Sequence, residues 1–107
     1  MSRRTSPLIL IDEAIHLLAT GEHGIKQRLL TAYVQKLQHI STPDVPAELL
    51  PMLTAIQKRF GRKPDQTERE SAVAAKSALD RMTASQAVKL AKSIVEFNAV
   101  FAGSLYH

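Results

Sequence analysis

Apolar residues recur every three or four positions through most of this chain, and no stretch alternates with the two-residue period of a strand. Helical spacing of this kind places the apolar side chains on one face of an α-helix. Short breaks rich in Gly, Pro, Ser and Thr separate the periodic stretches and carry the residues that end and begin helices. The pattern predicts an all-α fold, a compact bundle of four to five helices.

The first two helices have recognisable ends. Ser6 can cap the first, Pro7 suits its first position, and Gly21 is placed to end it. The second is expected from about Gly24 to Ile40, followed by a loop rich in Ser, Thr and Pro. The predicted buried faces are Leu8, Ile11, Ala14, Ile15 and Leu18 in the first helix, and Ile25, Leu29, Tyr33, Leu37 and Ile40 in the second.

Pro51 governs the third segment, because a proline deep in a helix removes a hydrogen bond and clashes with the preceding turn. Either a short turn at residues 46–49 precedes a helix with Pro51 in its first turn, or one helix kinks at Pro51. The first arrangement costs less and is preferred. Gly61 and Pro64 end the helix. Its expected buried face is Leu49, Leu53, Ile56 and Phe60.

The last two segments are expected to form an antiparallel hairpin, because the link between them is very short. Asp65 or Thr67 can cap the fourth helix and Thr83 the fifth, each with a Glu or Gln three residues on. The fourth has a thin face of mostly small residues: Ala72, Ala75, Ala78, Leu79 and Met82. The fifth has a broad one: Ala84, Ala87, Val88, Leu90, Ala91, Ile94, Val95, Phe97, Phe101 and Ala102.

Composition narrows the class of protein. The 107 residues are 45% hydrophobic, which predicts one globular domain over 1–107, with 1–5 as a flexible N-terminus. A domain this small leaves much surface exposed, which favours self-association as a homo-oligomer. The absence of Cys excludes disulfides, thiolate nucleophiles and Cys-ligated metals. The apolar run at 8–11 is too short to span a membrane, so a cytoplasmic protein without membrane attachment is expected.

The sharpest charge feature is a basic cluster, Lys58, Arg59, Arg62 and Lys63, in a chain of net charge +4. Four cations this close could neutralise the phosphates of a nucleic acid. Cations at a helix C-terminus also complement the helix dipole, which explains them without a ligand. The adjacent aromatic, Phe60, is assigned to the core, and no second basic stripe on a neighbouring helix extends the cluster. Nucleic-acid binding is therefore the alternative function.

Other polar residues give weaker signals. Glu22 and His23 lie in a glycine-flanked loop and form a candidate functional loop. Glu13 and His16 have the Glu-x-x-His spacing of di-metal bundles, but the second pair that such a site needs is missing, so no metal is expected. Asn98 falls on the apolar face of the fifth helix and is expected to need partners in the core.

No phosphate-binding glycine loop, nucleophile elbow or zinc-helix motif is present in the sequence. The sequence favours a small non-enzymatic interaction or regulatory protein, without a cofactor, that binds another protein or itself. Four apolar residues lie off the predicted buried faces, and a dimer is expected if they gather on one surface: Ile9, Val34, Val73 and Val100.

Overall fold

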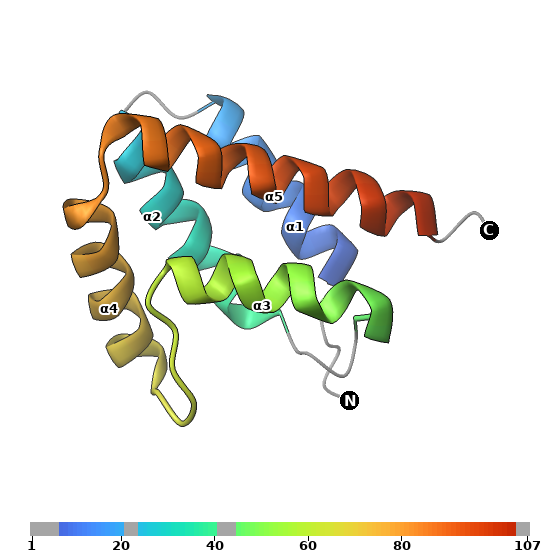
Figure 1. The fold of residues 1–107 in the computed structure, drawn as a ribbon, viewed down its shortest axis with the longest axis horizontal. Helices are drawn as coiled ribbons and strands as arrows, with labels where there is room; N and C mark the ends of the chain where they lie inside the picture. Colours follow the sequence, from blue (N-terminus) through green and yellow to red (C-terminus); the bar gives the residue numbers. More distant parts are fainter. Residues whose placement is uncertain (1–6, 21–23, 41–44, 105–107) are drawn as a thin grey trace.

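A computed structural model describes residues 7–20, 24–40 and 45–104, in which five α-helices and two short 3₁₀ turns are found and no strand (Figure 1). The prediction of an all-α bundle is confirmed. The predicted cap Ser6, the terminator Gly21 and the segment 1–5 lie outside the described residues. The elements are α1 (Pro7–Thr20), α2 (Ile25–Gln35), η1 (Leu37–His39), η3 (Ala47–Leu49), α3 (Leu50–Arg59), α4 (Glu68–Arg81) and α5 (Ala84–Ser104).

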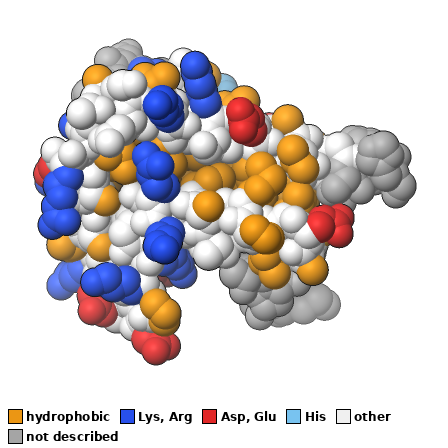
Figure 2. Space-filling view, in the orientation of Figure 1, with side chains coloured by type: hydrophobic (Ala, Val, Ile, Leu, Met, Phe, Trp, Pro, Cys, Tyr) orange, Lys and Arg blue, Asp and Glu red, His pale blue; other side chains and the backbone are white. Residues whose placement is uncertain are grey.

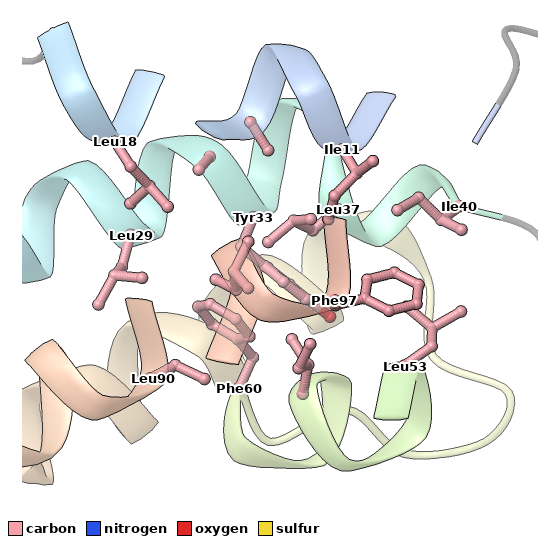
Figure 3. Close-up of a cluster of buried hydrophobic side chains, with 14 of the residues drawn as sticks. Ile11, Leu18, Leu29, Tyr33, Leu37, Ile40, Leu53, Phe60, Leu90 and Phe97 are labelled. Atoms are coloured by element: carbon pink, nitrogen blue, oxygen red, sulfur yellow. The ribbon is translucent and has the colours of Figure 1, made fainter. Parts of the chain in front are cut away.

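The long helix α5 organises the bundle, because it packs against α1, α2 and α3 (Figure 1). It runs antiparallel to α1 on one side and to α3 on the other. Buried side chains from these helices converge on one centre (Figure 3). The largest fully buried side chains are Tyr33, Phe60, Phe97, Ile11, Leu29, Leu37, Leu53, Leu79 and Ile94.

The expected antiparallel hairpin of α4 and α5 is wrong. Helix α4 stands at one end of the bundle, across the direction of α5, and packs mainly on α2 (Figure 1). Met82 is extended, with φ −77° and ψ 147°, and it turns the chain between the two helices. The buried face of α4 is then directed at α2, where the Ser71 and Tyr33 hydroxyls share a hydrogen bond. A short link fixes where a helix starts, but tertiary contacts fix its direction.

Helix ends follow the expected chemistry in several places. The Thr67 side chain accepts a hydrogen bond from the Glu70 backbone N–H, and the Glu70 side chain accepts one from the Thr67 N–H, so the capping box is complete. Thr83 and Gln86 make the same reciprocal pair before α5. Pro51 occupies the first turn of α3 behind η3, which confirms the preferred arrangement.

The second helix is shorter than expected. It ends at Gln35 instead of continuing to Ile40, because the backbone of Lys36 leaves the helical region at φ −129° and ψ −60°. The chain then tightens into η1. Leu37 and Ile40 still reach the core, so the expected buried face survives the change of helix type.

The apolar face of α5 is narrower than expected. One line along the helix is buried, whereas Val88 and Val95 are 42% and 49% exposed, and Asn98 is half-buried rather than buried. Helices α1 and α3 flank α5, and neither of them covers these valines. The buried line consists of Ala87, Leu90, Ile94, Phe97 and Phe101.

Candidate functional site

The basic cluster divides in the folded protein. Lys58 and Arg59 are exposed in the last turn of α3, where their charges complement the helix dipole. Lys63 is also exposed, and its backbone N–H donates to the Gln66 side chain at 2.9 Å. These three cations remain accessible to an acidic ligand.

Arg62 has a structural role. Its Nη1 donates to the backbone carbonyl of Gln38 at 2.9 Å, and the contact is partly buried. The bond ties the end of α3 to η1, which lies 24 positions earlier in the chain. A nucleic acid would therefore meet three free cations in this segment instead of the four that the sequence suggests.

A groove between α3 and α5 adjoins the basic cluster. It encloses about 280 Å³. Figure 2 shows hydrophobic side chains exposed in a band between the two helices, with Lys and Arg gathered where α3 ends and α5 begins. We call this the α3–α5 groove. Its lining residues are Met52, Ala55, Ile56, Arg59, Lys89, Leu90, Ser93 and Glu96.

The contribution of Lys89 is not visible in the local sequence. No second basic stripe was expected on a neighbouring helix, yet one cation of α5, Lys89, lines the same groove as Arg59 of α3. The two residues are 30 positions apart, and only the antiparallel packing of α3 on α5 brings them together. No local signal in the sequence could have revealed this pairing.

A second apolar surface follows the contact between α1 and α5. Exposed Val88 and Val95 lie beside residues of α1 and the start of α2 around an open hollow that is lined mostly by apolar residues. We call it the α1–α5 seam. It is lined by Ile15, Leu18, Ala19, Ile25, Val88, Ala91, Lys92, Val95 and Glu96.

The four apolar residues expected to mark a dimer surface do not gather. Ile9 lies near the far end of α5, beside Asn98. Val34 and Val73 line a separate hollow between α2 and α4. Val100 is exposed on α5 but lines neither the groove nor the seam. The premise for a dimer built on these four residues is therefore wrong.

The remaining polar candidates give no metal site in the described part of the chain. Glu13 accepts a hydrogen bond from Lys36 Nζ at 2.7 Å, which joins α1 to the end of α2. Within 7–20, 24–40 and 45–104, no three His, Asp or Glu side chains lie where they could hold a metal ion together. The candidate loop residues Glu22 and His23 lie outside the described residues.

None of the described helices combines the length and the apolar character needed to cross a membrane. No family model, no curated protein and no solved structure matches this chain.

Proposed function

We propose that this protein is a non-enzymatic interaction module that binds a second copy of itself through the α1–α5 seam. The observation that supports the proposal is the exposure of Val88 and Val95, 42% and 49%, at the rim of an apolar hollow. The two valines are seven positions apart on one helix, so they lie along one line of its surface. Covering that line with a second apolar surface removes it from water, which favours association.

The charges of the seam are self-complementary. Lys92 and Glu96 are both exposed and lie one turn apart beside the two valines. A two-fold axis brings the same patch of both copies together, so residues that differ within one copy can meet across the interface. With the two α5 helices antiparallel, Lys92 of each copy can approach Glu96 of the other. This arrangement favours a second copy over an unrelated partner.

The seam is small, which favours a weak dimer. Along α5 it runs from Val88 to Glu96, a length of about 12 Å, and a strip two helices wide is about 20 Å across. Its flat area of roughly 240 Å² is well below the area of about 800 Å² per partner that a standard interface buries, so we expect association only at micromolar concentrations or above.

Sedimentation of Val95→Gln beside Val100→Gln tests the proposal. Both substitutions replace an exposed valine of α5, with exposures of 49% and 45%, but only Val95 lies on the seam. We expect wild type and Val100→Gln to dimerise alike and Val95→Gln to be shifted toward monomer. A monomeric wild type at high micromolar concentration, or equal effects of the two variants, would overturn the proposal.

Charge reversal tests the register. Lys92→Glu alone should weaken the dimer, because it places acidic side chains opposite each other, and K92E/E96K should restore much of the association. Circular dichroism of each variant checks that α5 remains helical. A double variant no better than Lys92→Glu would exclude the antiparallel register.

A further inference from the structure

We infer that the α3–α5 groove binds an amphipathic helix of a partner protein that carries acidic residues at one end. This inference does not depend on self-association, because the apolar floor of the groove is separate from the α1–α5 seam. Of the lining residues, the two surfaces share only Glu96, which stands at the rim between them.

The floor of the groove is apolar and already well packed. Ile56 and Leu90 are 4% and 2% exposed and belong to the core, so they form a fixed base. Met52 is half-buried and Ala55 is exposed, and together they form an apolar wall of the groove that a partner can contact. The volume of about 280 Å³ lies at the lower limit of small-molecule pockets. The groove is therefore suited to a few side chains of a larger partner.

The charges select the chemistry of the occupant. Arg59 lies in the last turn of α3 and Lys89 near the start of α5, whereas Glu96 lies about two turns further along α5. Because the two helices run antiparallel (Figure 1), the two cations lie at one end of the groove and Glu96 lies toward the other. Within the described part of the chain, neither cation has an ion-pair partner. An acidic side chain placed between these two cations would be attracted by both, whereas one near Glu96 would be repelled. The groove therefore prefers an occupant that is acidic at one end only.

The geometry favours a helix as the occupant. Helices α3 and α5 lie side by side and antiparallel, and the furrow between two such helices accepts a third that inserts apolar residues at i, i+3 or i+4, and i+7 (Figure 1). The ten residues of α3 provide about 15 Å of wall, or nearly three helical turns of contact.

A nucleic acid fits the groove less well. Binding to single strands relies on aromatic side chains that stack on bases. Phe60, which follows Arg59 in the sequence, is fully buried and stacked on Tyr33, with ring centroids 4.4 Å apart. Arg62 is held by the Gln38 carbonyl. The apolar floor also offers nothing to a phosphate backbone.

The experiment uses two fluorescein-labelled peptides stapled as helices. Both carry Leu at i, i+4 and i+7; one has Glu residues at a single end, and the other has Lys at the same places. Fluorescence anisotropy with the full-length protein should show the Glu peptide bound at least about tenfold more tightly, and its binding should weaken as salt is added. Equal affinities for the two peptides would overturn the inference.

Matched variants locate the binding. Arg59→Gln and Lys89→Gln should each weaken binding of the Glu peptide, whereas Arg81→Gln, which removes an exposed cation of α4 outside the groove, should not. Ala55→Trp should block the groove, and Thr54→Trp on the neighbouring exposed position should not. Equal losses for Arg59→Gln and Arg81→Gln would reveal non-specific attraction and overturn the inference.

Two further measurements distinguish this inference from self-association and from nucleic-acid binding. The Val95→Gln variant should bind the Glu peptide as wild type does, whether or not the seam dimerises. A random-sequence DNA duplex and a single strand serve as the competing class. Either one binding more tightly than the Glu peptide, and losing that binding in Arg59→Gln and Lys89→Gln, would assign the groove to nucleic acid and overturn the inference.

Discussion

The side-chain hydroxyls of Tyr33 and Ser71 are 2.5 Å apart in the core, and their hydrogen bond joins α2 to α4 across 38 positions of sequence. The ring of Tyr33 also stacks on Phe60, at an interplanar angle of 19°. One buried residue thus connects α2, the end of α3 and α4, the helix that stands across α5. The position of α4 depends on this contact as well as on its thin apolar face.

Ser71→Ala should destabilise the protein by about 1–3 kcal/mol, because it leaves the buried Tyr33 hydroxyl without its partner. Tyr33→Phe should also destabilise the protein, because it leaves the buried Ser71 hydroxyl without its partner. In the double variant neither orphaned hydroxyl remains, so its loss of stability should be smaller than the sum of the single losses. Chemical denaturation of all four proteins measures the coupling. Losses that add to within about 0.5 kcal/mol would show that the bond contributes little.

Ile94→Ala should cost on the order of 2–5 kcal/mol, because this side chain is fully buried in the core. Val100→Ala, six positions along the same helix at an exposed site, should change the free energy of unfolding by less than about 0.5 kcal/mol. Thermal and chemical unfolding test both values. A loss at Ile94 well under 1 kcal/mol would mean that the buried line of α5 is wrongly placed.

Thr67→Ala should destabilise α4 by about 1 kcal/mol through loss of its N-cap. Hydrogen bonds from the Thr67 backbone, and then from its side chain, hold the pKa of Glu70 below its ordinary value of 4.5. The stabilisation that comes from the ionised Glu70 carboxylate is therefore complete above the ordinary pKa and is lost as the pH falls through the lowered pKa. NMR titration should show the pKa of Glu70 rising in Thr67→Ala. An unchanged pKa of Glu70 in this variant would show that the carboxylate does not depend on the Thr67 side chain.

Gly61→Ala should cost about 1–2 kcal/mol, because Gly61 has φ +77°, a conformation that side chains disfavour. A Cβ there would also lie 3.2 Å from the Ala74 carbonyl oxygen, which presses α4 away from the end of α3. Gly103→Ala is the control, since a Cβ at that helical position meets nothing within 4 Å. It should be neutral or slightly stabilising. Equal effects in thermal denaturation would show that the left-handed turn is not required.

Replacing Lys58, Arg59 and Lys63 together by Gln should leave stability almost unchanged, since exposed charges at a helix end contribute only a few tenths of a kcal/mol each. Arg62→Gln should cost about 1 kcal/mol, because the Gln38 carbonyl loses its donor. Wild type should retain nucleic acid only weakly at physiological salt. A salt-resistant, sub-micromolar complex with a defined sequence would favour the nucleic-acid function instead.

The helices themselves were readable in the sequence because their determinants are local. The pairs Thr67–Glu70 and Thr83–Gln86 act over three positions, and Pro51 restricts only its own turn. Periodicity likewise identified most of the core, since it reports which residues share a face. Leu53 and Phe60 were assigned to the interior in this way, and both are buried.

Tertiary packing determined how much of each apolar face is covered and which residues of different helices lie close together. A periodic pattern shows that Val88 and Val95 belong to an apolar arc, but only the neighbouring helices determine how much of that arc is covered. The same packing brings Lys89 beside Arg59 and holds Arg62 on Gln38. These arrangements bring together residues 24 to 30 positions apart, and their geometry depends on the angles at which whole helices meet. The local sequence determines each helix and its apolar face, whereas the exposed surfaces on which function is proposed form only when the helices pack together.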